Sequence, residues 1–227
     1  MQRSVRSKPR IFAVASIRIT MPQNLLIDLS YLPPLQWFSK VNAREKVTLE
    51  ACEHYRKGSY RNRCHIAGAQ GLLRLSVPLT AGKNAQMPVR EVRIAAEQPW
   101  QQQHWQSIQS AYGKSPFFEY YADDLRPFYE KKYERLWDWN FALLQCVTEL
   151  IGADVTYTFS DTYYKVPPPD TLDFRGGVHP NPHKALPDPE FEHVPYEQVF
   201  TEKHGFLPNL SILDALFCKG PETILLL

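Results

Sequence analysis

The sequence predicts one α/β domain in which helices flank a mainly parallel or mixed sheet. Short segments suited to strands are most frequent in the first third of the chain, and segments with helical spacing of apolar residues follow. Strands that alternate with helices favour an α/β sheet. At 227 residues, the chain is long enough to bury one sizeable core.

The expected strands are short and bounded by turn residues. Residues 24–29 form an apolar run suited to a buried strand, and Pro33 and Pro34 stop it. Alternation of apolar and polar residues, or enrichment in β-branched and aromatic residues, predicts further strands. These cover residues 46–51, 72–77, 89–94 and 155–159.

Apolar residues spaced by three or four positions predict the helices. Residues 35–41 form a short helix directly after the two prolines, and residues 100–112 form a longer one that Gly113 ends. Ser115, as a cap, and Pro116, at the first helical position, open another helical turn.

Two more helices are expected towards the C-terminus. Residues 126–151 are the longest candidate, because one broad apolar stripe runs along them. Residues 210–217 form the last helix, with Asn209 or Ser211 as its cap and Gly220 as its stop.

Two segments interrupt the regular pattern. Residues 165–195 are rich in proline, which predicts a long loop of the kind that often serves as a lid or a linker. Residues 1–20 are basic, and no acid precedes Asp28. We expect this leader to be disordered or to result from a start assigned too far upstream, with Met21 as the natural start and residues 21–227 as the domain.

The bulk composition argues against several classes of protein. A formal net charge of +2 is too small for a general nucleic-acid binder. No run of about 18 apolar residues occurs, which argues against membrane insertion. The four cysteines lie far apart and lack disulfide spacing, which favours a reducing, cytoplasmic location.

The segment from His54 to Arg63 has the composition of a polar surface site. It gathers a histidine, two tyrosines, four cations and an amide around one glycine. His54 is the candidate base, because an unperturbed imidazole titrates near working pH. Tyr55 or Tyr60 could orient it, and Tyr60 is a second catalytic candidate. The alternative is a surface histidine beside a strand end.

The cations of this segment suggest an anion site. Arg61 and Arg63 would point to the same side of an extended segment. Two guanidinium groups there would suit a phosphate, a diphosphate or a carboxylate. We expect Lys57, Ser59 and Asn62 to contribute to the same substrate site. The alternative is a solvated basic loop.

An aromatic loop, residues 31–38, follows the first expected strand, and residues 52–65 follow the second. In α/β sheets, ligands bind at the carboxyl ends of the strands. The two loops are therefore expected to share one small-molecule site, with Tyr31 among the substrate contacts.

Four residues elsewhere complete the candidates. His104 could reach the site as a catalytic group, or it could be a core histidine. Tyr112 and Lys114 could form a substrate-facing turn, or they could belong to a helix connector. Asp214 is an acid in an apolar helix, where it costs stability unless it is paired, and Arg61 or Arg63 is its expected partner.

No metal or cofactor is expected from the motifs. Cys52, His54, Cys64 and His65 match none of the common spacings of zinc ligands. Neither the GxGxxG pattern nor the GxxxxGK phosphate loop occurs.

Several ordered blocks of the chain resemble the WbqC-like protein family. They are YLPP at 31–34, EHYRKGSYRNR at 53–63, HWQSI at 104–108, YGKSPFF at 112–118 and FLPNLSILD at 206–214. The resemblance runs from about Leu25 to Leu227. One departure matters: many members carry His-Gln-Pro ahead of the Tyr-Leu-Pro loop, where this chain has Asp28-Leu29-Ser30. Any role of that histidine does not transfer, and Asp28 or His54 would have to substitute.

The resemblance implies a role in surface-polysaccharide (O-antigen) biosynthesis, and glycine transfer onto an amino sugar has been suggested for the family. Our leading hypothesis is a cytoplasmic transferase that places an aminoacyl or acyl group on a nucleotide-linked or glycan amino sugar. Its partner would be a small molecule, with oligomeric state left open. The competing hypothesis is a non-catalytic binding or scaffold protein of a polysaccharide assembly pathway.

Overall fold

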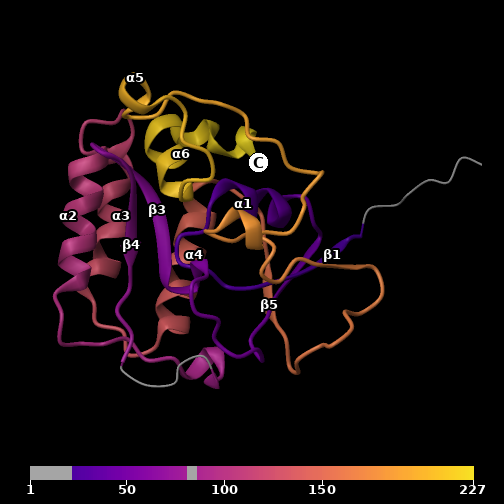
Figure 1. Ribbon diagram of the computed structural model, residues 1–227. Helices are drawn as coiled ribbons and strands as arrows, with labels where there is room; N and C mark the ends of the chain where they lie inside the picture. The colour runs from indigo at the N-terminus through magenta and orange to yellow at the C-terminus, as the bar shows by residue number, and fades with distance from the viewer. Residues whose placement is uncertain (1–21, 81–85) are drawn as a thin grey trace, which may run out of the picture.

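The computed structural model describes residues 22–80 and 86–227. Its main sheet has four parallel strands in the order β5-β2-β1-β6, and helices flank the sheet (Figure 1). The expected α/β class is confirmed. The expected leader, residues 1–20, lies outside the described residues. The strands are β1 Asn24–Ile27, β2 Lys46–Leu49, β5 Tyr157–Phe159 and β6 Thr171–Asp173.

One face of this sheet packs into the core. Leu25 and Ile27 of β1 stand beside Val47 and Leu49 of β2, and all four side chains are buried. Because successive residues of a strand point to opposite faces, Thr48 and its neighbours in register point to the other face.

The order of the strands creates a switch point. The chain adds β2 and then β5 on one side of β1, and it returns to add β6 on the other side. In open α/β sheets, ligands bind in the crevice outside the carboxyl ends of the strands at such a point. Residues that directly follow β1 and β6 are therefore the first candidates for a site.

The remaining elements lie mainly to one side of the sheet (Figure 1). An antiparallel hairpin of β3 and β4 packs beside α2, and α6 contacts α1, α3 and β3. The single-turn α5 precedes α6. The bounds are α1 Leu35–Asn42, β3 Arg63–Gly68, β4 Gly71–Ser76, α2 Trp100–Tyr112, α3 Phe118–Glu130, α4 Leu136–Leu150, α5 Thr201–His204 and α6 Ile212–Lys219.

The strand expected at 89–94 is wrong. Residues Val89–Glu91 form a 3-10 turn, and Ile94 makes only an isolated bridge with Leu79. Val89 and Val92 are both buried, and a spacing of three residues fits a 3-10 turn. The sequence analysis took the apolar and charged residues of 89–94 for the alternation of a strand and did not recognise this spacing.

The single helix expected at 126–151 is also wrong, because α3 and α4 are separate helices. Between them, Leu136 N donates to Val92 O, and Ile94 N donates to Glu134 O, each at 2.9 Å. These bonds hold the linking residues in an extended pairing. The helix start expected at Ser115 and Pro116 is also wrong, because α3 begins only at Phe118. The Ser115 hydroxyl does not cap α3 but donates to the carbonyl of Tyr112 at 2.6 Å.

The proline-rich segment is not structureless throughout. Residues Thr171–Asp173 form β6, and Pro182–Lys184 form a 3-10 turn. Between Pro169 and Pro180 the chain has no proline, so every backbone N–H of β6 can donate to a neighbouring strand. The loop prediction for 165–195 therefore missed the strand that completes the switch point.

Asp214 is buried on α6, and it does not pair with an arginine as the sequence suggested. Its carboxylate accepts hydrogen bonds from Tyr112 Oη at 2.8 Å, Tyr196 Oη at 2.7 Å and Gln198 Nε2 at 2.9 Å. Burial raises the pKa of Asp214, and the three donors oppose that shift. Ser211 caps α6, with its hydroxyl accepting from Leu213 N, as one of the two expected caps.

We expect Asp214→Ala to lower the free energy of unfolding by at least about 3 kcal/mol, because three buried donors lose their acceptor. Chemical denaturation measures this. Asp123→Ala, at an exposed position of α3, is the control and should change stability by no more than about 0.5 kcal/mol. Equal small effects in both variants would contradict a structural role for Asp214.

Candidate functional site

The segments after β1 and β6 meet at the switch point. Gly176, just beyond β6, donates its backbone N–H to Asp28 Oδ1 at 2.5 Å, just beyond β1. Gly176 has a φ of +69°, and a Cβ there would lie 3.3 Å from Arg56 Nη1. Glycine is thus favoured by its backbone conformation and by the close approach of a guanidinium group.

A buried arginine joins the strand ends. Arg61 is 1% exposed, and its Nε and Nη2 donate to Glu53 Oε1 at 2.7 and 2.5 Å. Its Nη1 lies 3.4 Å from Asp28 Oδ2. Arg61 sits in the 3-10 turn Tyr60–Asn62, not in an extended segment. The expectation that Arg61 and Arg63 share one side of an extended segment is therefore wrong, and the Arg61 guanidinium pairs with two internal carboxylates.

Glu53 has the most unusual environment of this cluster. Its side chain is 2% exposed, and its Oε2 is buried without a hydrogen-bond partner. Arg56 Nε lies 3.7 Å from that oxygen. Burial raises the pKa of Glu53 to about 7, against the opposing pull of Arg61 and Arg56, and the charge of Asp28 adds to the rise. Glu53 therefore changes its charge near neutral pH.

A pocket of about 460 Å³ has Glu53 among its lining residues. We call it the Glu53 pocket. Arg56 is half exposed here, so the pocket combines a titratable carboxyl group with a cation that can reach a ligand. Its lining residues are Cys52, Glu53, His54, Tyr55, Arg56 and Tyr163.

A second arginine fixes the far wall of the pocket. Arg175 Nη1 donates to Glu50 Oε2 at 2.7 Å, and its Nε and Nη2 donate to Asp173 at 2.8 and 2.6 Å. Its Nη2 also donates to the carbonyl of Tyr164 at 2.8 Å. The guanidinium lies 4.8 Å from the ring centre of Tyr163. These contacts tie residues 163–164 to the ends of β2 and β6.

The structure separates the three catalytic candidates of the sequence. His54 is exposed and lines the Glu53 pocket. Tyr60 is buried, its Oη lies 3.4 Å from His65 Nδ1, and burial raises its pKa to about 12. His104 is buried in the core, with Nδ1 3.0 Å from Tyr31 Oη, and burial lowers its pKa to about 4. Neither of these two lines the pocket.

The polar residues of the 54–63 segment mostly shape the turn. Ser59 Oγ accepts from Arg61 N and donates to Arg56 O, and Asn62 Nδ2 donates to Val77 O at 3.0 Å. Lys57 is exposed, and Arg63 begins β3. Among residues 54–63, only His54, Tyr55 and Arg56 line the pocket.

The remaining substrate candidates lie elsewhere. Tyr31 and Tyr112 have no exposed surface, so the expectation that they contact a substrate does not fit their core positions. Lys114 is exposed at the end of α2, where it lines a separate cavity of about 990 Å³.

Sequence reasoning missed Glu53, Tyr163 and Arg175, counted Arg56 only among the cations of the 54–63 segment, and gave Asp28 only as a stand-in for a histidine. Their common signal is position, because most of them follow closely after a strand that ends at the same edge of the sheet.

Within residues 22–80 and 86–227, no group of three or more metal-ligating side chains is placed to hold a metal ion. No helix of the described chain is long and apolar enough to cross a membrane.

We expect Arg61→Ala to lower the free energy of unfolding by about 3 to 5 kcal/mol, because it leaves Asp28 and Glu53 buried without their cation. Arg56→Ala, which removes a half-exposed cation, should cost no more than about 1 kcal/mol. Urea unfolding at pH 8 compares the two. Equal stability of both variants would show that Arg61 does not hold the strand ends together.

Comparison with known proteins found one family model and one relative that are similar to this chain. An uncharacterized protein of Mycobacterium tuberculosis, Rv1507c, is 26% identical to this chain over 228 residues, which is 89% of this chain and 96% of the relative. No solved structure matches. The model of the WbqC-like protein family matches residues 30–171, which include the Glu53 pocket and end in β6. The chain belongs to the WbqC-like protein family.

Proposed function

We propose that this protein transfers an acyl or aminoacyl group, with glycine as the aminoacyl candidate, onto an amino sugar in surface-polysaccharide (O-antigen) biosynthesis. The acceptor would be a nucleotide-linked sugar or a glycan. One observation carries the proposal: Glu53 is a buried carboxyl group at the switch point, with one oxygen that lacks a hydrogen-bond partner and with a pKa raised by burial to about 7. The family resemblance supports the pathway.

The reaction needs a base. The sugar amine attacks the carbonyl carbon of an activated donor, so that a nitrogen–carbon bond forms and the bond to the donor's leaving group breaks. Glu53, as the carboxylate, accepts the proton that the amine loses and returns it to the leaving group. A base with a pKa near the working pH serves both steps.

Glu53 takes the role that the sequence assigned to His54. His54 lines the same pocket, but its side chain is exposed. Glu53 is buried, and electrostatic interactions are stronger in the protein interior than in water. Arg56 is placed to bind a phosphate or carboxylate of the substrate. Its movement towards that group would uncover Glu53 Oε2, 3.7 Å away.

We expect Glu53→Gln to lower kcat/KM at least about a hundredfold by removing the base. In the wild type, kcat/KM should rise about tenfold per pH unit below pH 7 and level off above it, because only the carboxylate accepts a proton. The assay offers acetyl-coenzyme A or a glycyl thioester together with UDP-linked amino sugars, and mass spectrometry detects the product.

Glu45→Gln, at an exposed position before β2, is the matched control and should leave the rate and the pH profile unchanged. A Glu53→Gln variant with the wild-type rate and profile would rule out Glu53 as the base. No product from any pair with the wild-type protein would favour the non-catalytic scaffold hypothesis.

A further inference from the structure

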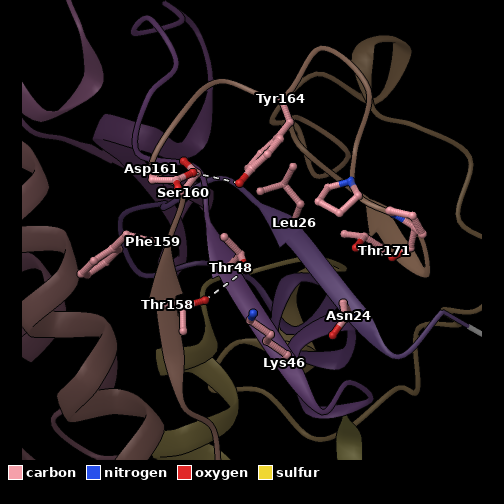
Figure 2. Close-up of a pocket in the computed structure, with 12 residues that line it drawn as sticks. Asn24, Leu26, Lys46, Thr48, Thr158, Phe159, Ser160, Asp161, Tyr164 and Thr171 are labelled. Carbon is pink, nitrogen blue, oxygen red and sulfur yellow. Dashed lines mark hydrogen bonds between the residues drawn. The ribbon is translucent and has the colours of Figure 1, made fainter.

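The face of the parallel sheet that points away from the core carries a second pocket. Parallel sheets are normally covered on both faces. In Figure 2, which looks onto this face, the helices in view lie beside or behind the strands. Residues 161–171 border the face and enclose a pocket of about 320 Å³. We call it the sheet-face pocket; its polar lining includes Asn24, Thr48, Thr158, Ser160, Tyr164 and Thr171.

Neutral hydrogen-bonding groups dominate this polar lining. Thr48 Oγ1 and Thr158 Oγ1 lie 3.1 Å apart on neighbouring strands, and both point towards the viewer's side in Figure 2. Thr158 Oγ1 also donates to Val47 O at 3.2 Å, so Thr48 is the donor between the two threonines, and both oxygens keep lone pairs that can accept from a ligand. Asn24 Nδ2 donates to Asp170 O at 3.1 Å, which leaves the amide oxygen of Asn24 to accept from a ligand. These acceptor oxygens can bind the hydroxyl donors of a saccharide.

The two charged side chains that line the sheet-face pocket have opposite signs. They are Lys46 and Asp161. Asp161 Oδ1 also accepts from Tyr164 Oη at 2.9 Å. Two charges of opposite sign do not favour a phosphate or a cation, so the ligand should be neutral. Small-molecule sites of this size combine apolar surface with a few polar groups.

Apolar surface is present beside the hydroxyls. It comes from Pro168 and Pro169, which are exposed and line the rim, whereas Leu26 at the centre of the face is only 1% exposed. Such surfaces can pack against the C–H groups of a sugar ring while the threonines bond its hydroxyls.

We propose that the sheet-face pocket binds the neutral saccharide part of the acceptor. This rests on the proposed transfer function. Residues 161–164 separate the two pockets: Tyr163 lines the Glu53 pocket, and Tyr164 lines the sheet-face pocket. Arg175 contacts both tyrosines and thereby holds the wall between the pockets. An acceptor bound on the sheet face would reach past this wall to present its amine beside Glu53.

The test is an amide NMR titration of the full chain with N-acetylglucosamine, its disaccharide and inorganic diphosphate. We expect saturable shifts at β2 and β5 with the sugars and none there with diphosphate. The Thr48→Val and Thr158→Val variants, singly and together, keep β-branched side chains suited to strands. The double variant should weaken sugar binding at least about tenfold. Thr156→Val, just before β5 and outside the lining, is the matched control.

Wild-type protein without shifts from either sugar would overturn the proposal, as would a folded double variant with unchanged affinity or stronger shifts with diphosphate. Glu53→Gln separates this inference from the function on which it rests, because that variant should bind the sugars like the wild type. Sugar binding without any dependence of transfer on Glu53 would contradict only the assignment of the base. Transfer that depends on Glu53, without sugar shifts at β2 and β5, would contradict only the saccharide subsite.

Discussion

The buried ion pair between Arg61 and Glu53 is the interaction on which the carboxyl edge of the sheet depends. Glu53 follows β2, Arg61 lies in the turn before β3, and Asp28 connects both to β1 and, through Gly176, to β6. The carboxylates that follow β1 and β2 therefore share one guanidinium group, and Gly176 joins β6 to them through Asp28. A buried pair of this kind contributes little net stability but is costly to break, because the remaining charges stay in the interior.

The same burial gives the site its chemistry. Two carboxyl groups face one arginine in a region shielded from water, and they are not equivalent. Asp28 uses Oδ1 to accept from Gly176 and Oδ2 to contact Arg61 and Ser30, whereas Glu53 leaves Oε2 without a hydrogen-bond partner. Carboxyl groups in unequal surroundings can take different roles in acid–base chemistry. Arg175 ties the neighbouring residues 163–164 to the ends of β2 and β6 through Glu50 and Asp173.

Local patterns in the sequence predicted most of the elements and only part of the site. Apolar runs and helical spacing located β1, α1, β2 and α2, because these elements bury residues at their own periodicity. The break between α3 and α4 depends on a distant pairing with Val92 and Ile94, which no local pattern shows. His54 stood out by residue type, and it does line the pocket. The sequence did not predict a role for the adjacent Glu53, because its burial and its pairing with Arg61 depend on contacts between segments that only the folded chain forms.

The titration of Glu53 tests the central claim most directly. Carbon-13 NMR of the side-chain carboxyl group, assigned by comparison with Glu53→Gln, follows its protonation against pH. We predict a midpoint of about 7, since burial outweighs the attraction to Arg61. A midpoint at or below the ordinary value for glutamate, about 4.3, would show that the ion pair dominates and that Glu53 is a structural anion, not a base.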